Sequence, residues 1–261
     1  MTKPKNTALI TGASSGIGKE FALYHAKQGG DLVIVARNST SLQKLKEQIE
    51  DTYKVNVTVI TQDLSEPGGP QKIFEQTNAA GLQIDILINN AGFGGHGKFH
   101  ERPLDQDLNM MQVNMFALVS LTHLYMQGMV QRKNGKILNL ASTAALLPGP
   151  LQAVYYATKA FVLSFSQAIA QELDGTGVSV TALCPGPVAT KFVSSAKLEG
   201  VEIFENAASA VTVAKCGYEA MQKGKLVAFN DKSLQFTLNW VVPFLPRKTV
   251  LKVSEKSMSK H

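Results

Sequence analysis

Cysteine is scarce in this chain, which has Cys184 and Cys216 among its 261 residues. Two cysteines cannot build the disulfide framework of a small secreted domain, and such sparse use suggests a reducing compartment. The polar stretch from Met1 to Asn6 leads into a short apolar run stopped by Gly12, a pattern unlike a signal peptide or a membrane span. We therefore expect a cytoplasmic protein.

Residues 1–221 have no excess charge, because they contain 18 basic and 18 acidic side chains. The last 40 residues contain 8 basic and 2 acidic side chains and account for the whole net charge of +6. Nucleic-acid-binding proteins usually spread basic residues along a reading element with aromatic platforms, so we do not expect nucleic acid as a partner. An apolar content of 44% excludes disordered and collagen-like chains.

Apolar, β-rich runs alternate with segments of helical periodicity almost throughout the chain. Several runs are continuously apolar, as expected of strands buried on both faces. The repeated strand–helix order predicts right-handed crossovers and a single α/β domain with a doubly wound parallel sheet of about seven strands, covered by helices on both faces. The expected strands are Thr7–Thr11, Asp31–Ala36, Val55–Thr61, Ile84–Asn89, Lys136–Leu140, Val178–Cys184 and Lys225–Phe229.

A helix is expected after the second of these strands. Thr40 and Gln43, three residues apart, match a capping box and predict that the helix starts there. Leu42, Leu45 and Ile49 would form its apolar face.

A glycine-rich turn with the spacing G-x-x-x-G-x-G joins the first strand to the helical run Lys19–Gln28. Glycines here let the backbone approach a pyrophosphate, and the helix N-terminus then faces the anion. The alternative is an ordinary tight strand–helix turn. The position between the first strand and the first helix favours nucleotide binding by Gly12, Ser14, Ser15, Gly16, Ile17 and Gly18.

The second strand ends at Ala36 and Arg37, with no carboxylate in reach. An acidic side chain at this place would bind a ribose 2′-hydroxyl, whereas an arginine accommodates the 2′-phosphate of NADP. Arg37 can hold that phosphate through two hydrogen bonds, unless it is simply a solvated loop residue. We expect NADP(H) as the cofactor, with NAD as the alternative.

Tyr155 and Lys159 stand four residues apart at the start of a long apolar-faced helix, so their side chains share one face. Tyr156 lacks such a partner. A Tyr-x-x-x-Lys pair alone is common and is often only a surface pair. Ser142 supports a catalytic interpretation because it follows the strand that ends at Leu140, and ligands bind at the carboxyl ends of strands in open α/β sheets.

Together these motifs resemble the classical short-chain dehydrogenase/reductase family, in family order over roughly residues 7 to 230. They are Thr11-Gly12-x-x-x-Gly16-x-Gly18, Asp63, Asn89-Asn90-Ala91-Gly92, Asn114, Ser142, Tyr155 with Lys159, and Pro185-Gly186. The resemblance implies a seven-stranded Rossmann-type sheet. It implies that Tyr155 is the acid/base and that Ser142 orients the substrate oxygen. It also implies that Lys159 binds the nicotinamide ribose and that Asn114 supports a proton relay.

The resemblance places further residues around the cofactor. Asp63 would hydrogen-bond the adenine, Asn90 would lie near the adenosine, and Thr190 would hold the nicotinamide carboxamide. Asp63 has the alternative role of an acidic residue at a helix N-terminus. Many NADP-preferring relatives have a basic residue where this chain has Ser15, so the cofactor preference depends largely on Arg37. The remaining expected contacts are Pro185, Gly186 and Val188.

The role of Tyr155 is physically reasonable. Hydride transfer to a carbonyl puts negative charge on the substrate oxygen, which needs a hydrogen bond and then a proton. Bringing the pKa of a tyrosine from about 10 to neutrality needs roughly 4 kcal/mol. An ammonium at about 4 Å, at an effective dielectric of 20, contributes about as much. We therefore expect Lys159 to lower the pKa of Tyr155.

The expected substrate is a hydrophobic ketone or aldehyde, such as an acyl-chain, steroid or terpenoid carbonyl. The candidate pocket walls are Phe93, Phe99, Ala144, Leu146, Leu147, Val188, Phe192 and Val193, although half of them could equally belong to the core. Lys98 and Lys191 are cations that could reach a carboxylate. The alternative functions are a hydroxysteroid-type alcohol dehydrogenase working in the oxidative direction and a non-catalytic dinucleotide-binding protein. We expect no metal.

The C-terminal segment, residues 232–261, combines an apolar stretch with basic residues. Leu234–Leu245 is too short to span a membrane. It is followed by Arg247, Lys248, Lys252, Lys256 and Lys260. The segment could be a substrate lid, a subunit contact or an amphipathic element in weak contact with an anionic membrane, and we favour the subunit contact. The family resemblance also implies a homodimer or homotetramer formed by long helices at Asp105–Met129 and Leu151–Leu173.

Overall fold

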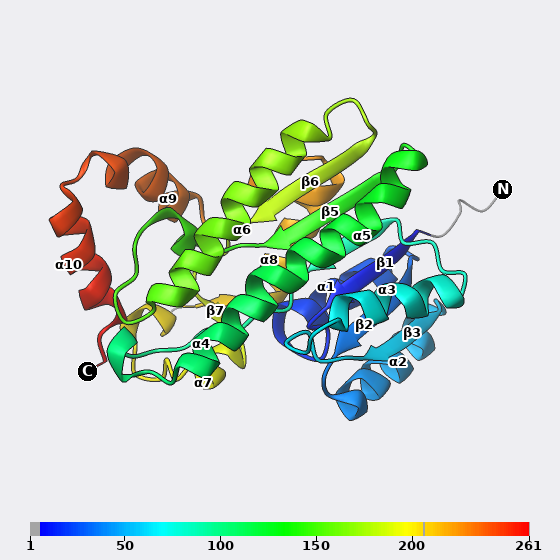
Figure 1. Cartoon of the computed structure of the whole chain (residues 1–261), viewed down its shortest axis with the longest axis horizontal. Helices are drawn as coiled ribbons and strands as arrows, with labels where there is room; N and C mark the ends of the chain where they lie inside the picture. Colours follow the sequence, from blue (N-terminus) through cyan, green and yellow to red (C-terminus); the bar gives the residue numbers. More distant parts are fainter. Residues whose placement is uncertain (1–5, 206, 261) are drawn as a thin grey trace.

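The computed structural model describes residues 6–205 and 207–260, so the polar start from Met1 to Lys5 lies outside the described residues. Within these ranges, a seven-stranded parallel sheet has the order β3-β2-β1-β4-β5-β6-β9 (Figure 1). The strands are β1 (Thr7–Thr11), β2 (Asp31–Ala36), β3 (Val57–Thr61), β4 (Ile86–Asn89), β5 (Gly135–Leu140), β6 (Val178–Leu183) and β9 (Val227–Ala228). The predicted doubly wound α/β fold is confirmed.

Each face of the sheet has its own apolar core, because successive residues of a strand point to opposite sides. On one side, Ala8 and Ile10 of β1 belong to the cluster around Phe21 of helix α1 (Gly16–Lys27). On the other side, Leu9 of the same strand belongs to a separate cluster. Burial on both faces explains why the strands are continuously apolar in sequence.

Two groups of helices cover the two faces (Figure 1). Helices α1, α2 and α8 contribute to the first core, and helices α3, α5 and α6 contribute to the second. Their bounds are α2 (Ser39–Tyr53), α3 (Gly69–Ala79), α5 (Leu118–Gln131), α6 (Ala153–Glu172) and α8 (Ala210–Gln222). The sheet is therefore covered on both sides, as its strand pattern predicted.

Helix α2 does not start at the predicted capping box. The side chain of Asn38 accepts a hydrogen bond from the backbone N–H of Ser41 at 2.8 Å, so Asn38 is the N-cap and the helix begins at Ser39. Thr40 lies inside the helix, and the prediction of a cap there was wrong. Asparagine is a stronger N-cap than threonine, which explains why the earlier residue caps the helix.

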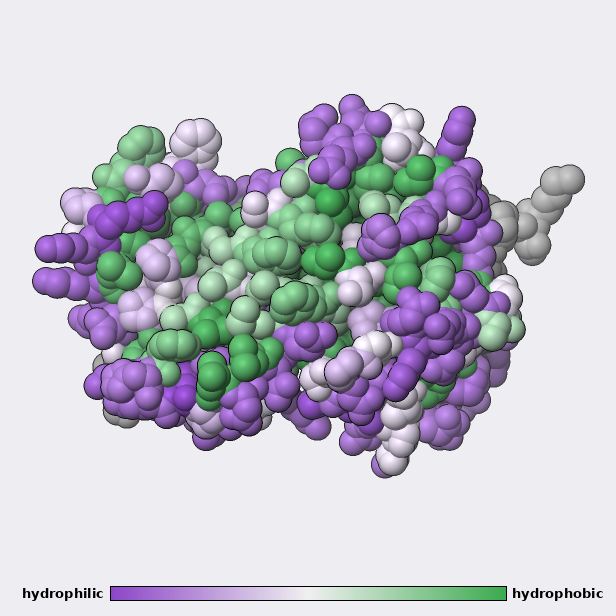
Figure 2. All heavy atoms as spheres, in the orientation of Figure 1, coloured by the Kyte–Doolittle hydropathy of each residue, from purple (hydrophilic) through white to green (hydrophobic). Residues whose placement is uncertain are grey.

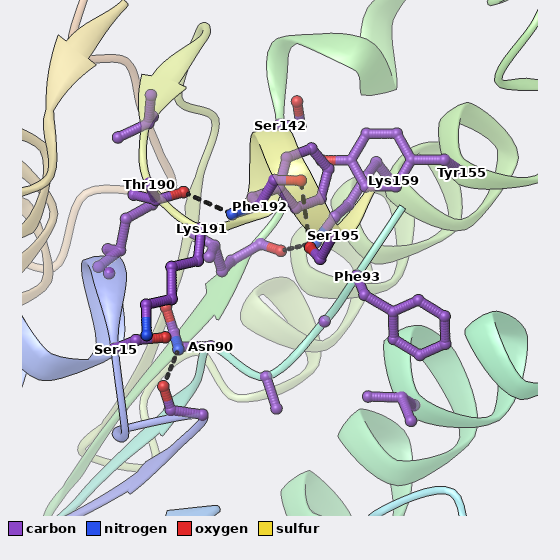
Figure 3. A pocket seen from close by; sticks show the side chains of 18 of the residues that line it. Ser15, Asn90, Phe93, Ser142, Tyr155, Lys159, Thr190, Lys191, Phe192 and Ser195 are labelled. Atoms are coloured by element: carbon purple, nitrogen blue, oxygen red, sulfur yellow. Dashed lines mark hydrogen bonds between the residues drawn. The ribbon is translucent and has the colours of Figure 1, made fainter. Parts of the chain in front are cut away.

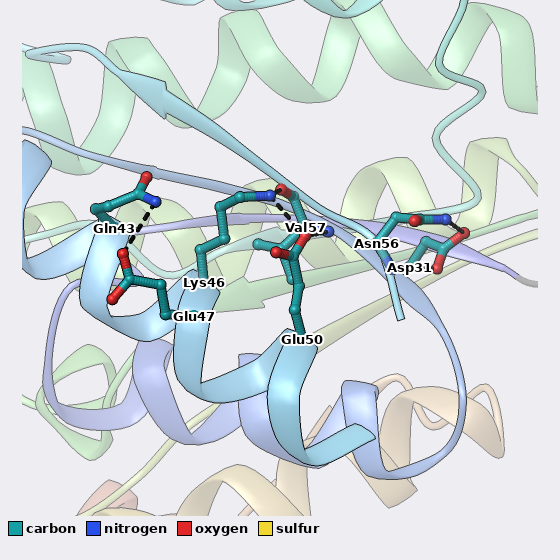
Figure 4. A network of polar contacts seen from close by, with 7 residues as sticks. All are labelled: Asp31, Gln43, Lys46, Glu47, Glu50, Asn56 and Val57. Atoms are coloured by element: carbon teal, nitrogen blue, oxygen red, sulfur yellow. Dashed lines mark hydrogen bonds and ion pairs between the residues drawn. The ribbon is translucent and has the colours of Figure 1, made fainter. Parts of the chain in front are cut away.

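A polar network ties α2 to the start of the edge strand β3 (Figure 4). The ammonium of Lys46 donates hydrogen bonds to Glu50 at 2.5 Å and to the carbonyl of Val57 at 2.6 Å. Glu50 also accepts the backbone N–H of Val57 at 3.0 Å, and the hydrogen bond from Lys46 holds the pKa of Glu50 below its ordinary value. In β2, Asp31 accepts the backbone N–H of Asn56 at 2.8 Å. These contacts fix where β3 begins beside β2.

The long helix predicted over Asp105–Met129 is interrupted. It consists of α4 (Leu104–Met111), a π-helical turn at Gln112–Ala117 and α5. The π-helical turn contains the buried Asn114, and such turns frequently occur at functional sites. The second predicted helix, over Leu151–Leu173, is α6 and starts two residues later than predicted.

The predicted and the observed strand ends differ most at the edge of the sheet. Strand β9 covers Val227–Ala228 rather than the predicted Lys225–Phe229. It lies at the edge of the sheet, where, among the described residues, β6 is its one neighbouring strand and pairs with these two residues. A second parallel sheet, formed by β7 (Val188–Ala189) and β8 (Ala208–Ser209), was not predicted. The short helix α7 (Phe192–Ser195) lies between these two strands in the chain.

The segment beyond β9 forms a helical lobe at the end of the molecule that the carboxyl ends of the strands face (Figure 1). It runs through α9 (Lys232–Phe236), a π-helical turn (Thr237–Val241), a 3-10 turn (Val242–Phe244) and α10 (Arg247–Met258). The lobe is joined to the body by a hydrogen bond of 2.8 Å between the His96 ring and the carbonyl of Met258. No helix among the described residues is long and apolar enough to cross a membrane.

Candidate functional site

A cavity of about 530 Å³ lies at the carboxyl ends of the central strands. The strand order reverses between β1 and β4, and open α/β sheets bind ligands at such a switch point. The predicted site residues that line the cavity are Gly12, Ser14, Ser15, Gly16, Ile17, Arg37, Asp63, Asn90, Ser142, Tyr155, Lys159, Pro185, Gly186, Val188 and Thr190. Gly18 and Asn114 do not line it but contact residues that do.

The glycine-rich turn brings the backbone to the cavity wall. Gly12 and Gly16 have φ angles of +68° and +56°, in the left-handed region that favours glycine. A Cβ on Gly18 would lie 2.4 Å from the carbonyl oxygen of Gly12 and 2.4 Å from the side-chain nitrogen of Asn90. The turn therefore requires glycine at these positions and leaves the N-terminus of α1 facing the cavity.

Replacing Gly18 by alanine is expected to destabilise the protein by about 3 kcal/mol, because the new methyl group would force the backbone at Gly12 to move. Urea unfolding of the parent and the variant measures this difference. The matched control is Gly128→Ala in α5, where the added Cβ would meet the guanidinium of Arg132, the end of a flexible side chain. This control should keep or raise the stability by up to about 1 kcal/mol. Parental stability of Gly18→Ala would contradict the close approach.

Thr11 and Asn90 join the ends of β1 and β4 beside the turn. The hydroxyl of Thr11 accepts hydrogen bonds from the backbone N–H groups of Asn90 at 3.0 Å and Ala91 at 2.9 Å. The side chain of Asn90 in turn donates to the carbonyl of Thr11 at 2.8 Å. These bonds fix the distance between the two strands at the switch point.

Arg37 and Asp63 lie together where β2 and β3 end. A guanidinium nitrogen of Arg37 is 3.8 Å from a carboxylate oxygen of Asp63, and the Arg37 side chain is 74% exposed. Asp63 also accepts hydrogen bonds from the backbone N–H and the hydroxyl of Ser65 at 2.8 and 2.7 Å. Burial acts to raise the pKa of Asp63, but Ser65 and Arg37 hold it below its ordinary value. The exposed guanidinium is thus in reach of an anion bound at this end.

Tyr155, Lys159 and Ser142 meet at another part of the same cavity (Figure 3). Tyr155 and Lys159 project from the first turns of α6, and Ser142 follows β5. The ammonium of Lys159 lies 5.8 Å from the centre of the Tyr155 ring and donates a hydrogen bond to the carbonyl of Leu140 at 2.6 Å. The ring of Phe192 packs against Tyr155, with 5.3 Å between the ring centres.

Burial governs the pKa values of this pair. Burial raises the pKa of the Tyr155 phenol, although a hydrogen bond with Ser142 lowers it. Burial lowers the pKa of Lys159 to about 8. We expected Lys159 to bring the pKa of Tyr155 toward neutrality, and the structure gives the opposite direction. Desolvation of the phenol is the largest cause, and the Lys159 ammonium lies 5.8 Å from the ring centre.

The family model described as short chain dehydrogenase matches residues 6–199. The chain belongs to this family. The resemblance that the sequence motifs indicated is therefore confirmed.

Several known proteins are similar to this short-chain dehydrogenase in sequence or in structure. The very-long-chain 3-oxoacyl-CoA reductase of Homo sapiens is 37% identical over 196 residues, which cover 73% of this chain and 62% of the human protein. The structure of a short-chain dehydrogenase from Sphingobium yanoikuyae in complex with NADPH is 28% identical, with a TM-score of 0.81 over 93% of this chain and 97% of that one. A 7beta-hydroxysteroid dehydrogenase structure is 26% identical, with a TM-score of 0.86 over 95% and 96%.

Asn114 of the dehydrogenase lies behind the cavity wall, where all its polar atoms are engaged. Its oxygen accepts the backbone N–H of Phe93 at 3.1 Å, and its nitrogen donates to the carbonyl of Phe93 at 3.0 Å and to the hydroxyl of Thr158 at 3.1 Å. A Cβ on Gly92 would lie 2.9 Å from the Asn114 oxygen. Asn114 therefore fixes the loop after β4 against α6, close to Lys159.

The apolar part of the cavity matches the predicted walls in part. Phe93, Ala144, Val188 and Phe192 line it as predicted. The prediction was wrong for Phe99, Leu146, Leu147 and Val193. Phe99 is 60% exposed on a short 3-10 turn, whereas Leu146 and Val193 pack into separate apolar clusters. Of the two candidate cations, Lys191 lines the cavity and Lys98 faces solvent.

Several residues that the sequence analysis did not single out complete the site of the dehydrogenase. Asn38, Gln62, Asn109, Gln152, Tyr156, Ile203, Phe204 and Met258 also line the cavity. Asn230 accepts the backbone N–H of Gly186 at 3.1 Å and so holds the Pro185-Gly186 loop. The sequence could have indicated Asn230, because it follows the last predicted strand. No local motif indicates Met258, which belongs to α10.

Proposed function

We propose that this short-chain dehydrogenase is an NADP(H)-dependent oxidoreductase that reduces a hydrophobic ketone or aldehyde to an alcohol. The observation that carries the proposal is the convergence of Tyr155, Lys159 and Ser142 on the cavity that the glycine-rich turn also lines. The NADPH in the Sphingobium structure supports the cofactor. The human relative, a reductase of 3-oxoacyl chains by name, supports the direction and the apolar substrate.

The cavity suits a nicotinamide dinucleotide because backbone forms the wall at the turn. A Cβ on Gly16 would lie 3.3 Å from Thr190, so a side chain there would fill the space. The proposed contacts are Gly12, Ser14, Ser15, Gly16, Ile17, Gly18, Arg37, Asp63, Asn90, Lys159, Pro185, Gly186, Val188 and Thr190. When bound, the nicotinamide would supply the hydride.

The chain's own residues would bind the substrate oxygen and give it a proton. Ser142 and Tyr155 would each donate a hydrogen bond to the oxygen as negative charge develops on it. Burial raises the pKa of Tyr155, so the phenol is protonated at neutral pH and ready to donate. Lys159 would favour the phenolate after transfer, and Asn114 would position the loop beside it. This protonation state suits reduction better than oxidation.

We infer a largely apolar substrate because several apolar side chains line the cavity together with Tyr155. Phe93 and Phe192 line the same cavity as the phenol, and so does Met258 from α10. A substrate oxygen at Ser142 and Tyr155 would place the rest of the molecule against these side chains. We propose an acyl-chain or similarly hydrophobic carbonyl as the substrate class.

We further propose a homo-oligomer formed through the face that carries α4, α5 and α6. Four large apolar side chains are exposed there: Leu104, Leu108, Phe116 and Phe161. Figure 2 shows apolar surface running across this part of the molecule. Surface of this kind usually marks a protein contact.

Consumption of NADPH over a panel of carbonyl compounds tests the proposed function. We expect turnover of long-chain 3-oxoacyl esters and bulky hydrophobic ketones, and little turnover of small sugars or keto acids. The same panel with NADH gives the cofactor preference. No consumption of either cofactor with any hydrophobic carbonyl or alcohol would contradict an enzymatic role.

Replacing Arg37 by alanine is expected to raise the KM for NADPH about 10- to 100-fold and to leave the KM for NADH nearly unchanged. An arginine–phosphate contact is a charge-assisted hydrogen bond, of the kind that contributes about 1.5–3 kcal/mol. The control is Lys72→Ala, which removes an exposed cation that pairs with Glu66 and does not line the cavity. Equal loss for both cofactors would show that Arg37 does not read the 2′-phosphate.

A further inference from the structure

Three aromatic side chains, spaced four residues apart, face solvent along the segment after β9. Phe236, Trp240 and Phe244 are 62%, 67% and 79% exposed, and their neighbours Val241 and Leu245 are 41% and 40% exposed. The segment runs continuously through α9, a π-helical turn and a 3-10 turn, and each of the three contributes one exposed ring. Leu238, on the other side, is buried. This arrangement turns an apolar stripe outward, and contiguous exposed apolar surface marks a binding surface.

Basic side chains border this aromatic stripe. Lys232 precedes it, and Arg247 begins the helix that follows it. On α10, the side buried against the body carries Val250, Ser254 and Met258. The opposite side is exposed and carries Lys248, Lys252 and Lys256. Residues 232–256 contain five basic side chains and one acidic side chain.

The charge and the apolar stripe occur at one end of the molecule. In Figure 2, apolar and strongly hydrophilic side chains lie next to each other at the end that α9 and α10 occupy in Figure 1. An amphipathic element with aromatic rings and lysines in this arrangement suits the surface of a bilayer. Aromatic rings sit at headgroup level, and lysines gain from the negative potential of anionic lipids.

We propose that residues 232–256 form a peripheral membrane-docking surface that binds an anionic lipid bilayer. A second copy of the chain fits this surface poorly. A symmetric contact would place five basic side chains and one acidic side chain against the same set. The apolar face over α4, α5 and α6 carries no such excess of one charge and is better suited to self-association. An anionic bilayer offers apolar contact to the aromatic side chains and attracts the lysines.

The docking surface is built next to the cavity. Leu234 of α9 would contact a Cβ on Gly186 at 3.2 Å, and both Gly186 and Met258 line the cavity. Docking would therefore bring the apolar part of the cavity close to the bilayer, where a hydrophobic substrate dissolves. The proposal does not depend on the proposed reaction, because binding to lipid is measured without turnover.

The test uses the full chain and its single tryptophan, Trp240, as the reporter. Vesicles of phosphatidylglycerol should shift its emission to shorter wavelength and carry the protein into the pellet on sedimentation. Vesicles of phosphatidylcholine should do so much more weakly. Salt at 1 M, where the Debye length is about 3 Å, should release most of the bound protein.

Two variants separate charge from apolar contact while keeping the reporter. Replacing Lys248, Lys252 and Lys256 by glutamine should weaken partitioning to anionic vesicles about 100-fold. Replacing Phe236 and Phe244 by alanine should weaken it at least about 10-fold. The matched control replaces Val211 and Leu226, apolar side chains that are 58% and 48% exposed and lie outside both surfaces, by alanine and should bind lipid as the parent does.

Circular dichroism and thermal unfolding show whether each variant keeps the fold, as expected for exposed positions. An unshifted Trp240 emission, with the parent left in the supernatant of anionic vesicles, would overturn the proposal. So would a blue shift that appears on raising the protein concentration without lipid, because a second copy would then cover the stripe. Equal loss of binding in the Val211 and Leu226 control would also overturn it.

Discussion

Turnover of a hydrophobic carbonyl by Tyr155→Phe is expected to fall by about 10²- to 10⁴-fold in kcat, because the variant loses the proposed proton donor and keeps the ring. The ring contact with Phe192, 5.3 Å between centres, needs no hydroxyl. The affinity for NADPH and the stability should therefore stay close to those of the parent. Steady-state kinetics with a long-chain 3-oxoacyl substrate, together with cofactor titration by fluorescence, measure the two effects separately.

The adjacent Tyr156 provides the matched control. It lies next to Tyr155 on α6 and lines the same cavity, with 6.2 Å between the two ring centres. We expect Tyr156→Phe to keep kcat within about threefold, because its phenol has no assigned role in proton transfer. Parental turnover in Tyr155→Phe, or an equal loss in both variants, would contradict the assignment of the proton donor.

Replacing Lys159 by methionine is expected to abolish turnover and, at neutral pH, to stabilise the fold. Burial lowers the pKa of Lys159 from 10.5 to about 8, so the folded protein holds an unfavourable ammonium at pH 7. The difference corresponds to roughly 3 kcal/mol. Loss of the hydrogen bond to the carbonyl of Leu140 offsets about 1 kcal/mol of this. A net gain of about 2 kcal/mol in the free energy of unfolding remains.

The gain should depend on pH in a defined way. Between pH 8 and 10.5, the unfolded parent holds a proton at Lys159 that the folded parent has released. Its free energy of unfolding therefore rises with pH across this window through this group. The advantage of Lys159→Met is full below pH 8 and shrinks as the pH rises. It is lost before pH 10.5, because the missing hydrogen bond to Leu140 still counts against the variant there. Urea unfolding of both proteins from pH 6.5 to 10.5 measures the difference.

The control for this prediction is Lys215→Met on α8, where the side chain is 59% exposed and pairs with Glu219 at 4.0 Å. An exposed pair of this kind contributes little to stability, so the control should match the parent at every pH. Lower stability of Lys159→Met at pH 7 would mean that the ammonium stabilises the fold, and it would contradict the direction of its pKa.

The sequence predicted those parts of the site that depend on local spacing. The glycine-rich turn, the four-residue spacing of Tyr155 and Lys159, and the place of Ser142 after a strand are all short-range patterns. They meet in one cavity because the parallel sheet brings the carboxyl ends of its strands to the same edge. The continuous apolar strands predicted the sheet for the same reason, since burial on both faces leaves a simple pattern.

The parts that the sequence did not predict depend on distant packing or on competition between neighbours. Asn38 and Thr40 both suit a helix start, and local energetics selects Asn38. Val193 looked like a cavity wall, but it packs with Met258 of α10 instead. The interruption at Gln112–Ala117 left no signal in the apolar spacing. The pKa of Tyr155 also could not be predicted, because desolvation depends on the whole surrounding shell.

The wide separation in sequence of the cavity walls has a consequence for biosynthesis. The walls run from Gly12 to Met258, and β9, at Val227–Ala228, completes the sheet late in the chain. A ribosome adds about 5–20 residues per second, so roughly 12–50 s separate the synthesis of the first wall residue from that of the last. The cavity is therefore complete only after nearly the whole chain has been synthesised.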